Sequence, residues 1–167
     1  MVTDTLHSAA ATIIDETLVS MRTIVADLGD GLVNTTPSLP QKNLPQTNSP
    51  YAIVFHCVEL TKFWAGSVIG GEQIPRDRAA EFRATGTAAA LCDAVDDVRT
   101  RVSDWLHIAV TEGVRDRDVR GSTRTADIAE ATPQWIILHI LRELAQHLGQ
   151  LELTRDVLLD AVDTPGG

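Results

Sequence analysis

Four long segments of the sequence repeat apolar residues with the period of an α-helix, and this pattern constrains the fold more than any other feature. In segment 4–28, apolar residues recur every three or four positions, which places them on one face of a helix. The same spacing recurs at 50–69, at about 87–112 and at 133–161. No stretch alternates polar and apolar residues long enough to predict a strand core. We therefore expect an all-α protein, a four-helix bundle with long connecting loops.

The residues that flank these segments are those that usually begin and end helices. Ser49 with Pro50, and Thr132 with Pro133, each combine an N-cap residue with a proline at the first helical position. Glycines follow the first two segments, as "GDG" after residue 28 and as the pair at 70–71. These signals set the expected helix boundaries.

The connections between the segments differ in length and composition. Residues 29–50 contain four prolines and are too long for a simple connector, so we expect them to lie over one end of the bundle. This first connection could cross the whole bundle, which would make the helix order other than simple up-and-down. The charged segment 72–86 and the polar segment 115–131 are expected to be solvated connections.

Composition indicates one soluble domain covering residues 1–167. The chain is 44% hydrophobic and 22% charged, and its net charge of −9 argues against nucleic acid or an anionic membrane as a partner. No apolar run reaches the roughly 18 residues of a spanning helix, and the N-terminus does not resemble a signal peptide. Cys57 and Cys92 form no CxxC pair and are expected to be reduced core residues. We therefore expect a cytoplasmic location.

Three possible metal ligands stand at four-residue intervals in the last helical segment: His139, Glu143 and His147. Residues four apart in a helix lie on one face and drift by only about 40° per step. His139 and His147, however, are separated by about 12 Å along the helix axis. Glu143 can therefore share an ion with one of these histidines, but not with both, and the other would lie along the pocket or at its rim.

A metal site here needs a ligand from a second helix, and His56 is the candidate. It lies within the apolar segment "IVFHCVELTKFW". One histidine from that helix, with a Glu/His pair from the last helix, gives the His₂Glu set typical of a catalytic zinc with an open position. The same ligands suit Ni, Fe or Mn.

Other interpretations of these residues remain open on spacing alone. A single histidine on an apolar helix face is often a hydrogen-bonded core residue, and Glu143 could be solvated. Glu59, three residues after His56, is either a partner in the metal site or a surface residue. No phosphate-binding loop, nucleophile elbow or HExxH motif is present, so no other catalytic pattern competes.

At these residues the sequence resembles a known family. "NSPYAIVFHCVELTKFWAGSVIGG", "AEFRATGT" and "WIILHILRELAQHLGQLELTRD" are similar to the DinB-like superfamily, and most similar to its actinobacterial mycothiol-dependent members. These are the mycothiol transferases and the N-terminal domain of mycothiol-dependent maleylpyruvate isomerase. The resemblance implies a metal, usually zinc, bound by His56, Glu143 and His147, with His139 lining the pocket. It also implies mycothiol as co-substrate and a homodimer.

The resemblance, together with the ligand set, predicts a metal-dependent thiol S-transferase that activates mycothiol as a metal-bound thiolate for attack on small electrophiles. The sequence ends at residue 167 without the second domain of the isomerase, so we expect a stand-alone transferase. Two alternatives use the same residues: a non-catalytic, dimeric metal-binding stress or interaction protein, and a metal-dependent hydrolase. Catalytic residues beyond the ligands cannot be assigned from the sequence.

Overall fold

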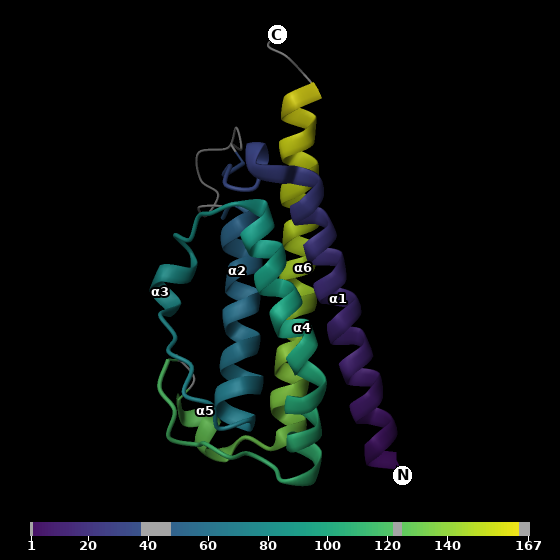
Figure 1. Ribbon diagram of the computed structural model, residues 1–167, viewed down its shortest axis with the longest axis vertical. Helices are drawn as coiled ribbons and strands as arrows, with labels where there is room; N and C mark the ends of the chain where they lie inside the picture. The colour runs from purple at the N-terminus through teal and green to yellow at the C-terminus, as the bar shows by residue number, and fades with distance from the viewer. Residues whose placement is uncertain (1, 38–47, 122–124, 164–167) are drawn as a thin grey trace.

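The computed structural model describes residues 2–37, 48–121 and 125–163, and its regular elements within these ranges are all helices. Four long helices form the body: α1 (Val2–Leu32), α2 (Pro50–Thr61) with its π-helical continuation η1 (Lys62–Ile69), α4 (Ala88–Thr111) and α6 (Pro133–Asp163). Two short helices, α3 (Arg78–Glu81) and α5 (Thr125–Glu130), lie in the connections (Figure 1). The prediction of an all-α bundle is confirmed.

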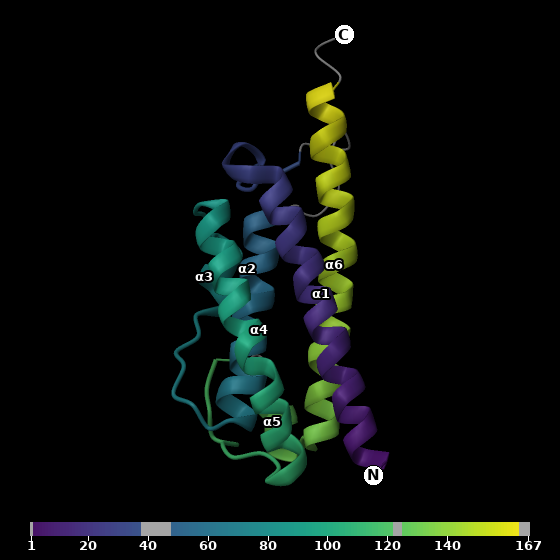
Figure 2. The ribbon, with the colours of Figure 1, turned by 45° about the vertical axis from the view of Figure 1, so that its right-hand side comes forward.

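The helices do not follow a simple up-and-down order. Helices α1 and α6 run in one direction along the bundle, and α2 and α4 run in the other (Figures 1 and 2). Because α2 and α4 are parallel, residues 70–87 return along the length of the bundle. This is the second connection, and not the first one, for which the sequence had left a crossing open.

Backbone hydrogen bonds show which segments meet at each end. At one end, the N–H of Tyr51 donates to the carbonyl of Val33 at 2.8 Å, which joins the start of α2 to the end of α1. At the other end, the N–H of Arg115 donates to the carbonyl of Ile69 at 3.3 Å. The first connection therefore begins and ends at the same end of the bundle. Residues 38–47, for which we predicted a path over the bundle end, lie outside the described residues.

The two predicted caps begin the long helices α2 and α6. Ser49 Oγ accepts from the N–H of Ala52 at 3.2 Å, and Thr132 Oγ1 accepts from the N–H of Trp135 at 3.2 Å. Each satisfies a backbone donor that the first helical turn leaves unpaired. At the predicted end of α1, Gly29 leaves the helical region with φ 57°, which kinks the helix, and helical structure resumes up to Leu32.

Helix α1 packs on α4 and α6, and α2 packs on α6, so one core lies between the four long helices. Trp64 and Trp105 are 1% and 2% exposed and belong to this core. The stretch Pro50–Ile69 is long and apolar enough to cross a membrane by length and composition, unlike our expectation from the sequence. Of its most apolar 18 residues, 83% are buried inside the bundle, as in the core helix of a soluble protein.

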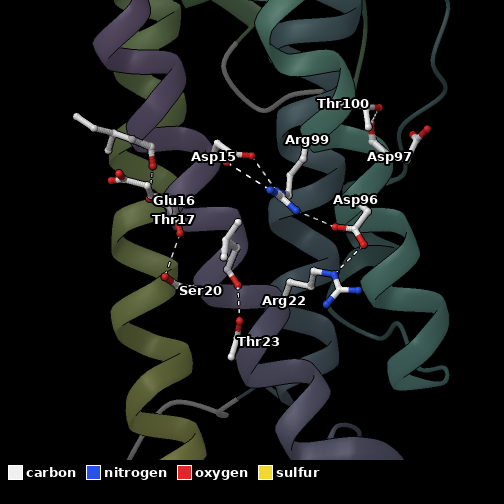
Figure 3. Close-up of polar contacts among 12 residues, drawn as sticks. Asp15, Glu16, Thr17, Ser20, Arg22, Thr23, Asp96, Asp97, Arg99 and Thr100 are labelled. Atoms are coloured by element: carbon white, nitrogen blue, oxygen red, sulfur yellow. Dashed lines mark hydrogen bonds and ion pairs between the residues drawn. The ribbon is translucent and has the colours of Figure 1, made fainter.

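On the outer side of α1 and α4, ion pairs join the two helices (Figure 3). Arg99 Nε donates to Asp15 at 2.8 Å, and Arg22 Nε donates to Asp96 at 2.7 Å. Arg99 also donates to Asp96 at 3.0 Å. Such exposed pairs contribute about 0–1 kcal/mol each, so the bundle depends mainly on its apolar core.

The connection 70–87 is only in part the solvated segment that we expected, because Arg78 and Arg83 are exposed but two other charged side chains are not. Arg76 and Glu81 in this connection are only 3% and 1% exposed. The guanidinium of Arg76 lies over the ring of Phe63, 5.1 Å from its centroid, and the carboxylate of Glu81 lies between Arg76 and His56. The charges are buried because they pair with each other.

Candidate metal centre

Antiparallel packing of α2 on α6 brings together the three residues that the sequence singled out as ligands. His56 comes from the middle of α2, and Glu143 and His147 come from adjacent turns of α6. One ligand atom from each side chain can be chosen so that all three lie within 4.8 Å of one another. His56 is 2% exposed, whereas the other two are partly buried.

The orientation of His56 is fixed by a carboxylate from the crossing connection. Its Nδ1 lies 2.6 Å from Glu81 Oε2, and Arg76 donates to both oxygens of the same carboxylate, at 2.6 and 3.1 Å. Burial favours the neutral acid, but the hydrogen bonds from His56 and Arg76 prevail and lower the pKa of Glu81. An ionised carboxylate only accepts, so Nδ1 of His56 carries the hydrogen, and a neutral ring keeps its lone pair on Nε2.

His147 is arranged in the same way. Its Nδ1 lies 3.0 Å from Gln150 Oε1, an oxygen that can only accept, so Nδ1 is the donor. Its Nε2 faces Glu143 Oε2 at 4.0 Å. Burial lowers the pKa of His147, and the neighbouring His56 acts in the same direction, against the hydrogen bond that His147 donates to Gln150. The neutral ring, which is the form that binds a metal, is therefore favoured.

Glu143 is held as a carboxylate. Arg142 donates to its Oε1 at 2.6 Å. Burial favours the neutral acid here too, but this hydrogen bond and the nearby His139 lower the pKa of Glu143. The ligand trio thus contains one anionic oxygen donor and two imidazole nitrogens.

His139 lies one turn further along α6 and forms part of the wall beside the trio. Its ring stacks on Trp135 at 5.0 Å between centroids and meets Trp64 edge-on at 4.8 Å. Arg142 lies 2.9 Å from its Nδ1, and since arginine only donates, that nitrogen is the acceptor. Its Nδ1 is 3.8 Å from Glu143 Oε1. That His139 lines a substrate pocket stays a prediction.

Sequence reasoning did not find Glu81, Arg76 or Gln150. It considered Glu59 as a partner for His56, but the carboxylate of Glu59 accepts from Lys62 at 3.2 Å. The acceptor for His56 Nδ1 is instead Glu81, 25 residues along the chain and outside any periodic segment. Only the short spacing between His147 and Gln150, which are three apart on one helix, could have been used for prediction.

Cys57 does not take part in the centre. It is fully buried, and burial, with the negative charges of Glu143 and Glu81, raises the pKa of its thiol far above the usual range. The thiolate is the nucleophilic form of cysteine, so Cys57 acts as a small core residue, as expected.

The three donors fit one divalent metal ion. Ligands at 2.0–2.1 Å around a tetrahedral zinc lie about 3.4 Å from one another, so donors within 4.8 Å need to move by about 1 Å only. Both histidines present Nε2 while Nδ1 is hydrogen-bonded, which is the usual arrangement around metal-bound histidines.

Comparison of the sequence with models of protein families identifies the family of this chain. The sequence model of mycothiol-S-transferases matches residues 11–160, which is most of its length. The chain belongs to the mycothiol-S-transferase family. Membership in this family makes it a transferase whose thiol substrate is of the mycothiol type, as the resemblance implied. No curated protein and no solved structure matches it.

Proposed function

We propose that this protein is a metal-dependent mycothiol S-transferase with His56, Glu143 and His147 as its metal ligands. The observation that carries the proposal is the convergence of these ligand atoms within 4.8 Å, from two helices of a mycothiol-S-transferase family member. Zinc suits two imidazoles and one carboxylate best, and Ni, Fe and Mn are the alternatives.

The charge of the site explains how it would assist the reaction. His56 and His147 are neutral ligands, so Glu143 supplies the single negative charge of the trio. A divalent metal held there would retain net positive charge and stabilise mycothiol as the thiolate, which is the reactive form of a thiol. Glu81 and Gln150 keep the two rings in position through their Nδ1 atoms.

The aromatic wall beside the trio suits the second substrate. Trp64, Trp135 and His139 pack ring against ring on one side of Glu143. Phe82 stacks on His56 at 4.8 Å between centroids. We place a small electrophile against the partly exposed rings of Trp135 and Phe82, where stacking and exclusion of water would hold it near the thiolate. A cytoplasmic homodimer remains part of the proposal.

Mycothiol and 1-chloro-2,4-dinitrobenzene test this function directly. The metal-loaded protein should form the S-conjugate, and the chelated protein should not. His147→Ala should abolish the reaction, whereas His107→Ala, at an exposed histidine of α4, should leave it intact. Thiol-independent release of chloride would instead identify a hydrolase. Equal conjugation by the chelated and the metal-loaded protein would overturn the proposal.

A further inference from the structure

The most deeply buried charged pair described in this protein lies next to the proposed metal centre but belongs to neither metal-binding helix. Arg76 and Glu81 are 3% and 1% exposed, and both come from the connection that crosses the bundle between η1 and α4. A buried ion pair costs much of its Coulomb energy in desolvation, so it is weak evidence of a purely stabilising role. What the pair contacts is therefore the more informative observation.

The carboxylate of Glu81 connects Arg76 to His56. Oε2 of Glu81 lies 2.6 Å from His56 Nδ1 and 3.1 Å from a terminal nitrogen of Arg76, while Oε1 accepts from Arg76 Nε at 2.6 Å. Both oxygens are thus engaged by donors of this chain. Glu81 therefore orients a ligand and is not available as a fourth one.

Arg76 is in turn held by residues from two other parts of the chain. Its guanidinium lies over the ring of Phe63 in η1, 5.1 Å from the centroid. On another side, Gly121 has φ +127°, and a Cβ there would lie 3.1 Å from Arg76 Cβ and 3.2 Å from the Phe63 ring. Because residue 121 is glycine and has no side chain, Arg76 and the Phe63 ring can pack directly against its backbone.

From these contacts we infer that Arg76 and Glu81 are positioning residues for the metal: they fix His56 in the Nδ1–H form and aim its Nε2 at the ion. The inference rests on the proposed metal centre. Arg76 keeps Glu81 ionised and immobile, and Glu81 holds the ring that would otherwise rotate about its side-chain bonds. Partners of this kind commonly change metal affinity by 10- to 100-fold when they are altered.

The experiment compares Glu81→Gln with Glu59→Gln. Glutamine keeps the size of Glu81 and can still accept from His56, but it loses the charge that holds Arg76. Glu59 lies on the same helix as His56, but its carboxylate pairs with Lys62. Glu59→Gln therefore controls for the loss of one carboxylate charge that does not contact His56. Zinc affinity is measured by competition with a chromogenic chelator, and metal-free melting curves check that both variants fold.

We expect Glu81→Gln to bind zinc 10- to 100-fold more weakly than the wild type and Glu59→Gln to bind as the wild type does. Zinc affinity of Glu81→Gln within twofold of the wild type would overturn the inference. A wild type that binds no metal would contradict the proposed function instead, so the two failures are distinguishable.

A second measurement needs no variant and no metal. Long-range ¹H–¹⁵N correlation spectra of the metal-free wild type report which ring nitrogen of His56 carries hydrogen. The inference requires hydrogen on Nδ1 of His56. If the Arg76–Glu81 pair only stabilised the fold and did not act on the ring, either nitrogen could carry the hydrogen. Finding the Nε2–H form in the folded wild type would also overturn the inference.

Discussion

At the scale of single residues, both histidines of the proposed centre are held through Nδ1, one by a carboxylate and one by an amide. This leaves the same ring atom, Nε2, for the metal in both. Glu143 adds a carboxylate whose ionised form is favoured by Arg142 and His139. The three side chains thus offer one carboxylate and two ring Nε2 atoms as donors for a divalent metal.

The acid sensitivity of the metal-free protein should depend on Glu81. Its pKa in the folded protein is lowered, so its contribution to stability is fully present above about pH 4.5, the ordinary value, and is lost as pH falls through the folded pKa. Urea unfolding between pH 3 and 6 should therefore show a steeper loss of stability in the wild type than in Glu81→Gln. Identical pH dependence in the two proteins would contradict this role.

At the scale of helices, the close packing of η1 on α4 depends on small residues. A Cβ at Gly70 would lie 2.6 Å from the carbonyl oxygen of Gly66 and 3.0 Å from the ring of Trp105. The backbone cannot move aside as a flexible side chain can. Residue 70 therefore has no room for a side chain between the π-helical turn and the indole of Trp105.

Two glycine-to-alanine changes should therefore have opposite effects on stability. Gly70→Ala should destabilise the protein by about 1–3 kcal/mol because of overpacking. Gly149→Ala in α6, where an added Cβ meets nothing within 4 Å, should stabilise it by up to about 1 kcal/mol through helix propensity. Urea denaturation of both variants measures this, and a stabilising Gly70→Ala would show that the packing is looser than described.

The helices could be predicted because periodicity encodes them, and the starts at Pro50 and Pro133 follow from local patterns. Spacing placed His139, Glu143 and His147 on one helix face but left open which histidine would share an ion with Glu143. The choice of His147, to act together with His56, came from the family resemblance. Glu81 could not be found in this way, because its contact with His56 depends on the path of a connection that has no periodic pattern.

The relative directions of the helices could not be predicted from the sequence either. The long first connection suggested a crossing, but α1 continues to Leu32, so that connection is 17 residues long, and the chain crosses in the 18 residues 70–87. An extended chain covers up to about 3.3–3.6 Å per residue, so a connection of this length is long enough to return along α2. Length alone therefore did not identify the connection that crosses.

At the scale of the whole molecule, the metal should join the two halves of the bundle. His56 lies on α2, and Glu143 and His147 lie on α6, so one ion would bind both helices. The crossing connection reaches the same point through Glu81. Metal binding should therefore stabilise the folded chain as a unit.

Thermal unfolding with and without zinc tests this linkage. Zinc at 1,000 times its dissociation constant should add about 4 kcal/mol to the free energy of unfolding and raise the Tm on the order of 10 °C. His147→Ala should show little change in Tm with zinc, whereas His107→Ala should respond as the wild type does. Equal shifts in wild type and His147→Ala would place the metal elsewhere.

The most direct test of the proposed metal-dependent transferase is the metal content of the purified protein after loading with zinc and removal of free ion. We predict about one zinc ion per chain in the wild type and none tightly bound in His56→Ala or His147→Ala. A wild type that retains no divalent metal under any loading condition, or variants that retain it fully, would contradict the proposed centre.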